Sequence, residues 1–88
     1  MKTWMAGADR LSPWREAKVV VAGLGTSGFA AADGLMDLGA QVTVLDESAS
    51  AINTEKATLL GMLDATVRLG PGATAELPED TDLVVTSP

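Results

Sequence analysis

Residues 19–28 read VVVAGLGTSG, an apolar β-branched run that passes directly into a glycine-rich turn. The run is continuous rather than alternating, which predicts a strand over residues 17–22 that is covered on both faces, as in a parallel sheet. Small and apolar residues then recur at helical spacing, so a helix is predicted over residues 26–38. This stretch is therefore interpreted as a strand, a tight turn and a helix in direct succession.

The residues after this helix indicate that the same pattern continues. Residues 41–45 predict a second strand that ends at Asp46, and a strand–helix–strand unit of this kind almost always has a right-handed crossover. We therefore predict an α/β fold, a Rossmann-like parallel sheet with flanking helices and the spatial strand order 3-2-1-4. The remaining predicted elements are a helix over 51–60 and strands over 65–69 and 82–86, the last with Leu83, Val84 and Val85 buried.

The composition narrows the possible functions. The 88 residues are enough for one small domain, with 1–16 as an N-terminal tail and 17–88 as the domain, whose sheet is expected to be truncated at its C-terminal end. No cysteine or histidine is present, which excludes a disulfide, a thiolate zinc site and a histidine base. The net charge of −6 argues against nucleic acid and anionic membranes as partners. The expected location is the cytoplasm, because no leader peptide or apolar stretch of about 20 residues is found.

Three glycines in the turn predict a binding site for a diphosphate. Gly23 allows the tight turn, Gly25 lets a phosphate approach the backbone, and Gly28 lets the helix pack closely on the strand. The free N–H groups of the first helical turn would face the phosphates, and the hydroxyl groups of Thr26 and Ser27 could also donate. The plainer interpretation is a glycine turn that serves only packing.

Two further residues bear on the ligand of this turn. Asp46 lies 18 residues after Gly28 (46 − 28), near the spacing of about 20 at which an acid accepts hydrogen bonds from a nucleoside. It could also be a solvated loop acid or a helix cap. Phe29 occupies the position of the lysine in an ATP-binding P-loop, so this turn is not predicted to bind ATP alone. We expect no lysine or arginine at the turn and no metal site in the chain.

Three stretches resemble the N-terminal domain of the Mur ligase family, in particular its D-glutamate-adding members. They are residues 19–28, residues 39–46 (GAQVTVLD) and residues 83–88 (LVVTSP), within a likeness that extends over residues 14–88. The resemblance implies that residues 17–88 are the UDP-binding domain of a three-domain ligase. Such a ligase activates a carboxylate as an acyl phosphate and forms an amide bond during peptidoglycan synthesis. Its ATP and magnesium belong to the central domain, so no catalytic residue and no cofactor is assigned to this chain.

The same resemblance implies that the partners are UDP-N-acetylmuramoyl-L-alanine and the central and C-terminal domains. The positions of this sequence that match the family's motifs would lie at the diphosphate, around the uracil and in a loop that closes over the nucleotide. Glu47 and Ser48 depart from the polar and basic residues often found around the uracil. The substrate-binding residues so implied are Gly25, Thr26, Ser27, Asp46, Glu47, Ser48, Ser87 and Pro88.

Two other functions remain open from the residues alone. The turn and Asp46 suit the NAD- or FAD-binding start of an oxidoreductase equally well, because an acid at this position suits a ribose hydroxyl. A stand-alone nucleotide sensor is the third possibility, but the chain stops in the middle of the expected sheet. Residues 86–88 (TSP) after an apolar strand favour the ligase, since this ending is less usual in dehydrogenases.

Overall fold

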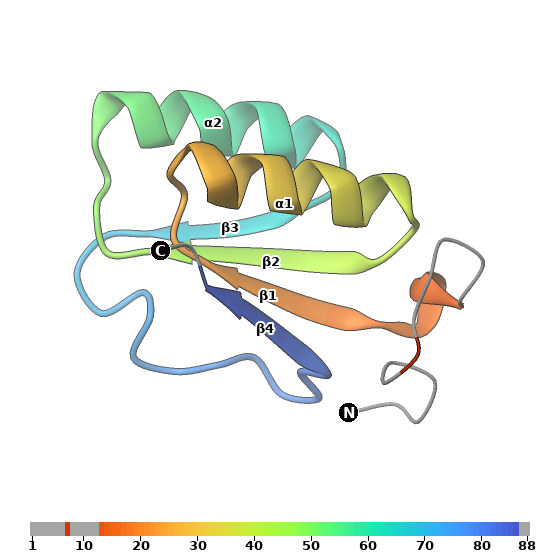
Figure 1. Cartoon of the computed structure of the whole chain (residues 1–88). Coiled ribbons are helices and arrows are strands. Elements are labelled where there is room, and N and C mark those ends of the chain that lie inside the picture. The colour runs from red at the N-terminus through yellow and green to blue at the C-terminus, as the bar shows by residue number, and fades with distance from the viewer. Residues whose placement is uncertain (1–6, 8–12, 87–88) are drawn as a thin grey trace.

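The computed structural model describes residue 7 and residues 13–86. In this part of the chain, strands and helices alternate from β1 to β3, a loop leads from β3 to β4, and the strands form one parallel sheet in the order β3-β2-β1-β4 (Figure 1). The predicted Rossmann-like α/β fold and the strand order 3-2-1-4 are confirmed. The elements are β1 (Lys18–Ala22), α1 (Thr26–Asp37), β2 (Gln41–Asp46), α2 (Ala51–Met62), β3 (Thr66–Leu69) and β4 (Leu83–Thr86).

The core lies between the sheet and the two helices, which cover the same face (Figure 1). Val19 and Val21 of β1 are paired in register with Val42 and Val44 of β2, and all four side chains are buried. Leu60 of α2 is fully buried against them, as are Leu24 and Ala32. Each buried valine or leucine contributes roughly 1.5–3 kcal/mol relative to an exposed one, so this layer fixes how the helices lie on the sheet.

The opposite face of the sheet differs from the prediction at β4. Val84 is 41% exposed, and Leu83 and Val85 are only half-buried, so the expectation that all three are buried is wrong. Among the described strands, β4 lies at an edge and is paired only with β1. Val84 is in register with Val20 on the face that the helices do not cover. Continuous apolarity indicates a parallel strand, but it does not ensure that described residues cover both of its faces.

Two residues outside the regular elements help to define the domain. Trp14 begins a short 3-10 turn (Trp14–Glu16) and is only 9% exposed, so it covers the edge of the core. Gly39 follows α1 with a φ of +97°, a left-handed conformation that favours glycine and often ends a helix. No described helix is both long and apolar enough to cross a membrane.

Candidate functional site

The glycine turn connects β1 to α1 at the carboxyl end of the sheet. Gly23 has a φ of +107°, which favours glycine, and its N–H donates to the carbonyl of Leu45 at 2.7 Å. A Cβ atom built on Gly28 would overlap the carbonyl oxygen of Gly23, so the helix and the turn are in direct contact there. A Cβ atom on Gly25 would meet no atom within 4 Å. The turn is thus closed at Gly28 and open at Gly25.

The N-terminus of α1 is left without a side-chain cap. Its N-cap is Gly25, and the first helical hydrogen bond runs from the N–H of Phe29 to the carbonyl of Gly25 at 2.9 Å. Gly25, Thr26 and Ser27, which form this helix start, are all exposed. In α2, by contrast, the hydroxyl of Ser50 caps the helix. An exposed, uncapped helix start beside a glycine turn can bind an anion through its N–H groups.

Asp46 links the end of β2 to this turn. One oxygen of its carboxylate accepts a hydrogen bond from the N–H of Leu24 at 2.7 Å, and the other accepts from the N–H of Ser48 at 2.8 Å. The structure therefore brings three of the predicted site regions together, the turn, Asp46 and Ser48. Each carboxylate oxygen can accept more than one hydrogen bond, so Asp46 can hold the turn and still accept from a ligand hydroxyl.

Glu47 binds a loop that the sequence analysis did not connect to the site. Its carboxylate accepts hydrogen bonds from the N–H of Thr74 at 2.7 Å, the hydroxyl of Thr74 at 2.8 Å and the N–H of Gly72 at 3.1 Å. These bonds, the one from the Thr74 N–H above all, lower the pKa of Glu47. The loop after β3 is thereby held against the start of the β2–α2 connection, next to Asp46.

Lys56 is a second residue that the sequence analysis missed. Its ammonium group donates to the carbonyl of Leu24 at 3.2 Å, so α2 places a cation at the glycine turn. The expectation that no lysine or arginine lies at the turn is wrong for this reason. The contact joins residues 32 positions apart, and only the packing of α2 beside α1 brings them together. The local sequence gives no signal for it.

The end of β4 also lies at this edge of the sheet. Thr86 is in register with Ala22, the residue that precedes the glycine turn. The predicted site residues Ser87 and Pro88 lie outside the described residues. The described part of the site therefore consists of the glycine turn, the β2–α2 connection and the loop after β3, all at the carboxyl ends of parallel strands. In α/β sheets of this kind ligands bind at these ends.

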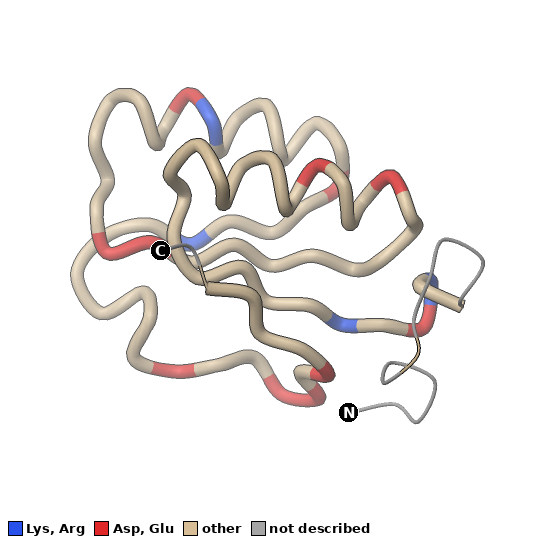
Figure 2. Tube along the Cα trace, in the orientation of Figure 1, with Lys and Arg blue, Asp and Glu red and all other residues tan. Residues whose placement is uncertain are grey.

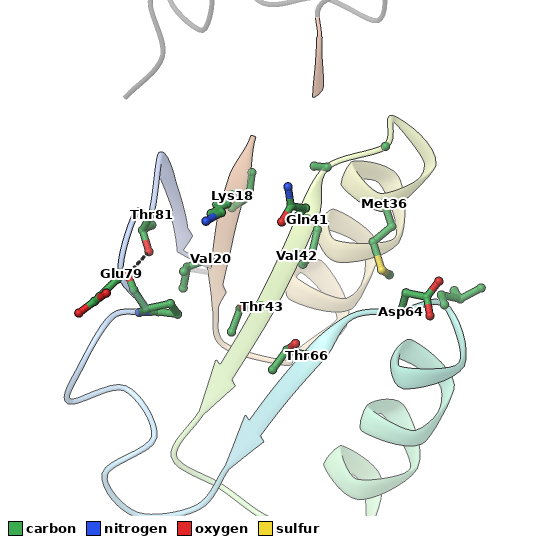
Figure 3. Close-up of a pocket in the computed structure, with 15 residues that line it drawn as sticks. Lys18, Val20, Met36, Gln41, Val42, Thr43, Asp64, Thr66, Glu79 and Thr81 are labelled. Carbon is green, nitrogen blue, oxygen red and sulfur yellow. Dashed lines mark hydrogen bonds between the residues drawn. The ribbon is translucent and has the colours of Figure 1, made fainter. Parts of the chain in front are cut away.

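A cavity of about 430 Å³ lies at the other end of the sheet (Figure 3). Lys18 and Gln41, the first residues of β1 and β2, contribute to its lining, together with Thr43 and Thr66. None of the residues of the glycine turn lines it. The cavity is thus separate from the carboxyl-end site, and its position at the amino ends of the strands argues against it as the nucleotide site.

Comparison with known proteins gives matches of two kinds, a family model and a group of curated proteins. A family model described as Alanine dehydrogenase/PNT, C-terminal domain, matches residues 2–87. Curated proteins named UDP-N-acetylmuramoylalanine--D-glutamate ligase also match. The one from Streptomyces avermitilis is 47% identical over 78 residues, which are 89% of this chain and 16% of the relative. The one from Streptomyces coelicolor is 51% identical over 70 residues, or 80% of this chain and 14% of the relative.

The likeness to these ligases is confined to a small part of each relative. A further one, from Thermobifida fusca, is 49% identical over 74 residues, or 84% of this chain and 16% of the relative. The chain thus spans about one sixth of the curated relatives that it matches. No solved structure matches it significantly. The chain belongs to the Rossmann-like family described as Alanine dehydrogenase/PNT, C-terminal domain, and its sequence identifies it as a Mur ligase domain related to the UDP-N-acetylmuramoylalanine--D-glutamate ligases.

Proposed function

We propose that this chain binds the uridine diphosphate part of UDP-N-acetylmuramoyl-L-alanine, as the substrate domain of an ATP-dependent D-glutamate-adding ligase of peptidoglycan synthesis. The observation that carries the proposal is the exposed, uncapped start of α1 at Gly25, in a chain that is 45–51% identical to ligases of that name. The diphosphate would lie on the N–H groups of Thr26 and Ser27. Asp46 would accept hydrogen bonds from the nucleoside.

The proposal places ATP and magnesium outside this chain. Four residues separate Gly23 from Gly28, as in a P-loop, but Phe29 follows in place of the lysine that would reach the phosphates. The described residues also contain no cluster of three or more acids that could hold a metal ion. The proposed role of this chain is to bind and orient the nucleotide end of the substrate.

A second candidate is the binding of NAD by an oxidoreductase domain. The description of the matching family model favours it, and so does Asp46, whose half-buried carboxylate lies at the end of β2 beside the turn. An acid in this place suits a ribose diol as well as it suits a uridine. The ligase relatives favour UDP, so we keep NAD as the competing ligand to be tested directly.

The two candidates are distinguished by titrating the chain with UDP and with NAD under nuclear magnetic resonance. We expect UDP to shift the amide signals of residues 24–28 and 46–48, and we expect NAD to bind less tightly. Uridine and adenosine serve as controls for the two nucleosides. Micromolar binding of NAD without any response to UDP would overturn the ligase proposal.

A further inference from the structure

The described basic residues are unevenly placed around the glycine turn. Figure 2 shows a single basic segment on α2, which in sequence is Lys56. Arg15 and Lys18 precede or begin β1 and so lie at the amino end of the sheet, and Arg68 is exposed on the edge strand β3. Of these four residues, only Lys56 makes a hydrogen bond to the glycine turn.

The ammonium group of Lys56 has no acidic partner in the described part of the chain. It is half-buried, and its one hydrogen bond goes to the backbone carbonyl of Leu24 at 3.2 Å. A lysine has three donors, so two remain for another acceptor. A carbonyl group accepts a hydrogen bond but does not neutralise the charge. A partly buried cation without a counter-ion is a favourable position for an anionic ligand.

The position of Leu24 indicates which anion that is. Leu24 is adjacent to Gly25, where the space for a Cβ atom is empty and where α1 begins without a cap. We propose that Lys56 is a phosphate-binding residue that contacts the diphosphate held at the start of α1. This inference rests on the proposed function and adds to it a specific charged contact from α2. The cation also offsets, at the turn itself, the net charge of −6 that repels the ligand from the chain.

The inference is tested by comparing UDP with uridine, since the two differ only in the phosphates. In the full 88-residue chain we expect Lys56→Met to weaken UDP binding about tenfold, the loss expected for one charge-assisted hydrogen bond. Uridine binding should stay unchanged, and Lys56→Arg should retain most of the affinity for UDP. Lys18→Met is the matched control, because it makes the same chemical change at the amino end of the sheet.

The outcomes separate this inference from the proposed function. If the unmodified chain binds UDP but Lys56→Met binds it equally well, the inference is wrong and the proposed function stands. If the variant loses UDP and uridine to the same degree, Lys56 only holds the turn through Leu24, and the inference is again wrong. If the unmodified chain does not bind UDP, both fail. Circular dichroism would show whether Lys56→Met still folds. If it does not, Lys56→Gln, which removes the charge but keeps a donor, is titrated with UDP and uridine in its place and judged by the same outcomes.

Discussion

At the scale of single residues, two glycines of one turn have opposite surroundings. Gly25 has a φ of −74°, which any residue can adopt, and the space beside it is empty. Gly28 instead lies against the carbonyl of Gly23, where no side chain fits. The spacing of the glycines is visible in the sequence. Only the packing shows that Gly25 leaves room for a ligand, whereas Gly28 lets the helix and the turn come into direct contact.

Because Gly25 and Gly28 have different surroundings, a valine at the first should affect UDP binding and a valine at the second should affect stability. Gly25→Val should abolish UDP binding and leave the melting temperature almost unchanged, because its side chain would occupy the space of the phosphates. Gly28→Val should lower the stability by about 1–3 kcal/mol or more, as overpacking does. Thermal unfolding and UDP titration of both variants measure the two effects. Gly34→Ala, in the interior of α1 with empty space around it, is the control and should be slightly stabilising. Equal losses of stability and binding in the two valine variants would contradict this division.

At the scale of elements, the connection after β2 holds the loop after β3 through one carboxylate. Because hydrogen bonds to Thr74 and Gly72 lower the pKa of Glu47 in the folded chain, its contribution is present above the unfolded-state pKa. The contribution is lost as the pH falls through the lower folded-state pKa. The loop should therefore stay anchored at neutral pH and be released only in acid.

A pH titration of the amide signals of Gly72 and Thr74 tests this anchoring. We expect both signals to move together, with a midpoint below the usual pKa of a glutamate. Glu47→Gln should remove that transition and speed the hydrogen exchange of both amides. Glu76→Gln, an exposed acid in the same loop, is the matched control and should leave them unchanged. A transition that persists without Glu47 would show that another group anchors the loop.

At the scale of the whole molecule, the isolated chain is expected to bind UDP weakly. The start of a helix contributes about 0.3–1 kcal/mol per charge, and each charge-assisted hydrogen bond about 1.5–3 kcal/mol before the costs of ordering. A micromolar Kd requires about 8.2 kcal/mol, and the net charge of −6 opposes an anionic ligand. We therefore predict a Kd on the order of 1 mM, measured by nuclear magnetic resonance titration. A micromolar Kd for UDP would show that this sum omits a major contact.

The sequence predicts the fold more fully than it predicts the site. Strand order follows from β-branched runs that alternate with helical spacing, and these are local signals. The contacts that complete the site join distant positions, since Lys56 is 32 residues from Leu24 and Glu47 is 27 from Thr74. Such contacts depend on how α2 and the loop pack, which no local pattern encodes. The ligand roles of Asp46 and of residues 25–27 remain predictions.

The position of β1 at the centre of the sheet has a consequence for the order in which the chain folds. Its pairing with β2 needs only the crossover through α1, whereas its other neighbour, β4, is reached across 64 residues. Contacts of long sequence separation cost more loop-closure entropy and form later. During synthesis, β1, α1 and β2 can therefore assemble while one edge of β1 still exposes its backbone N–H and C=O groups. That edge stays open to wrong strand pairing until β4 pairs with it.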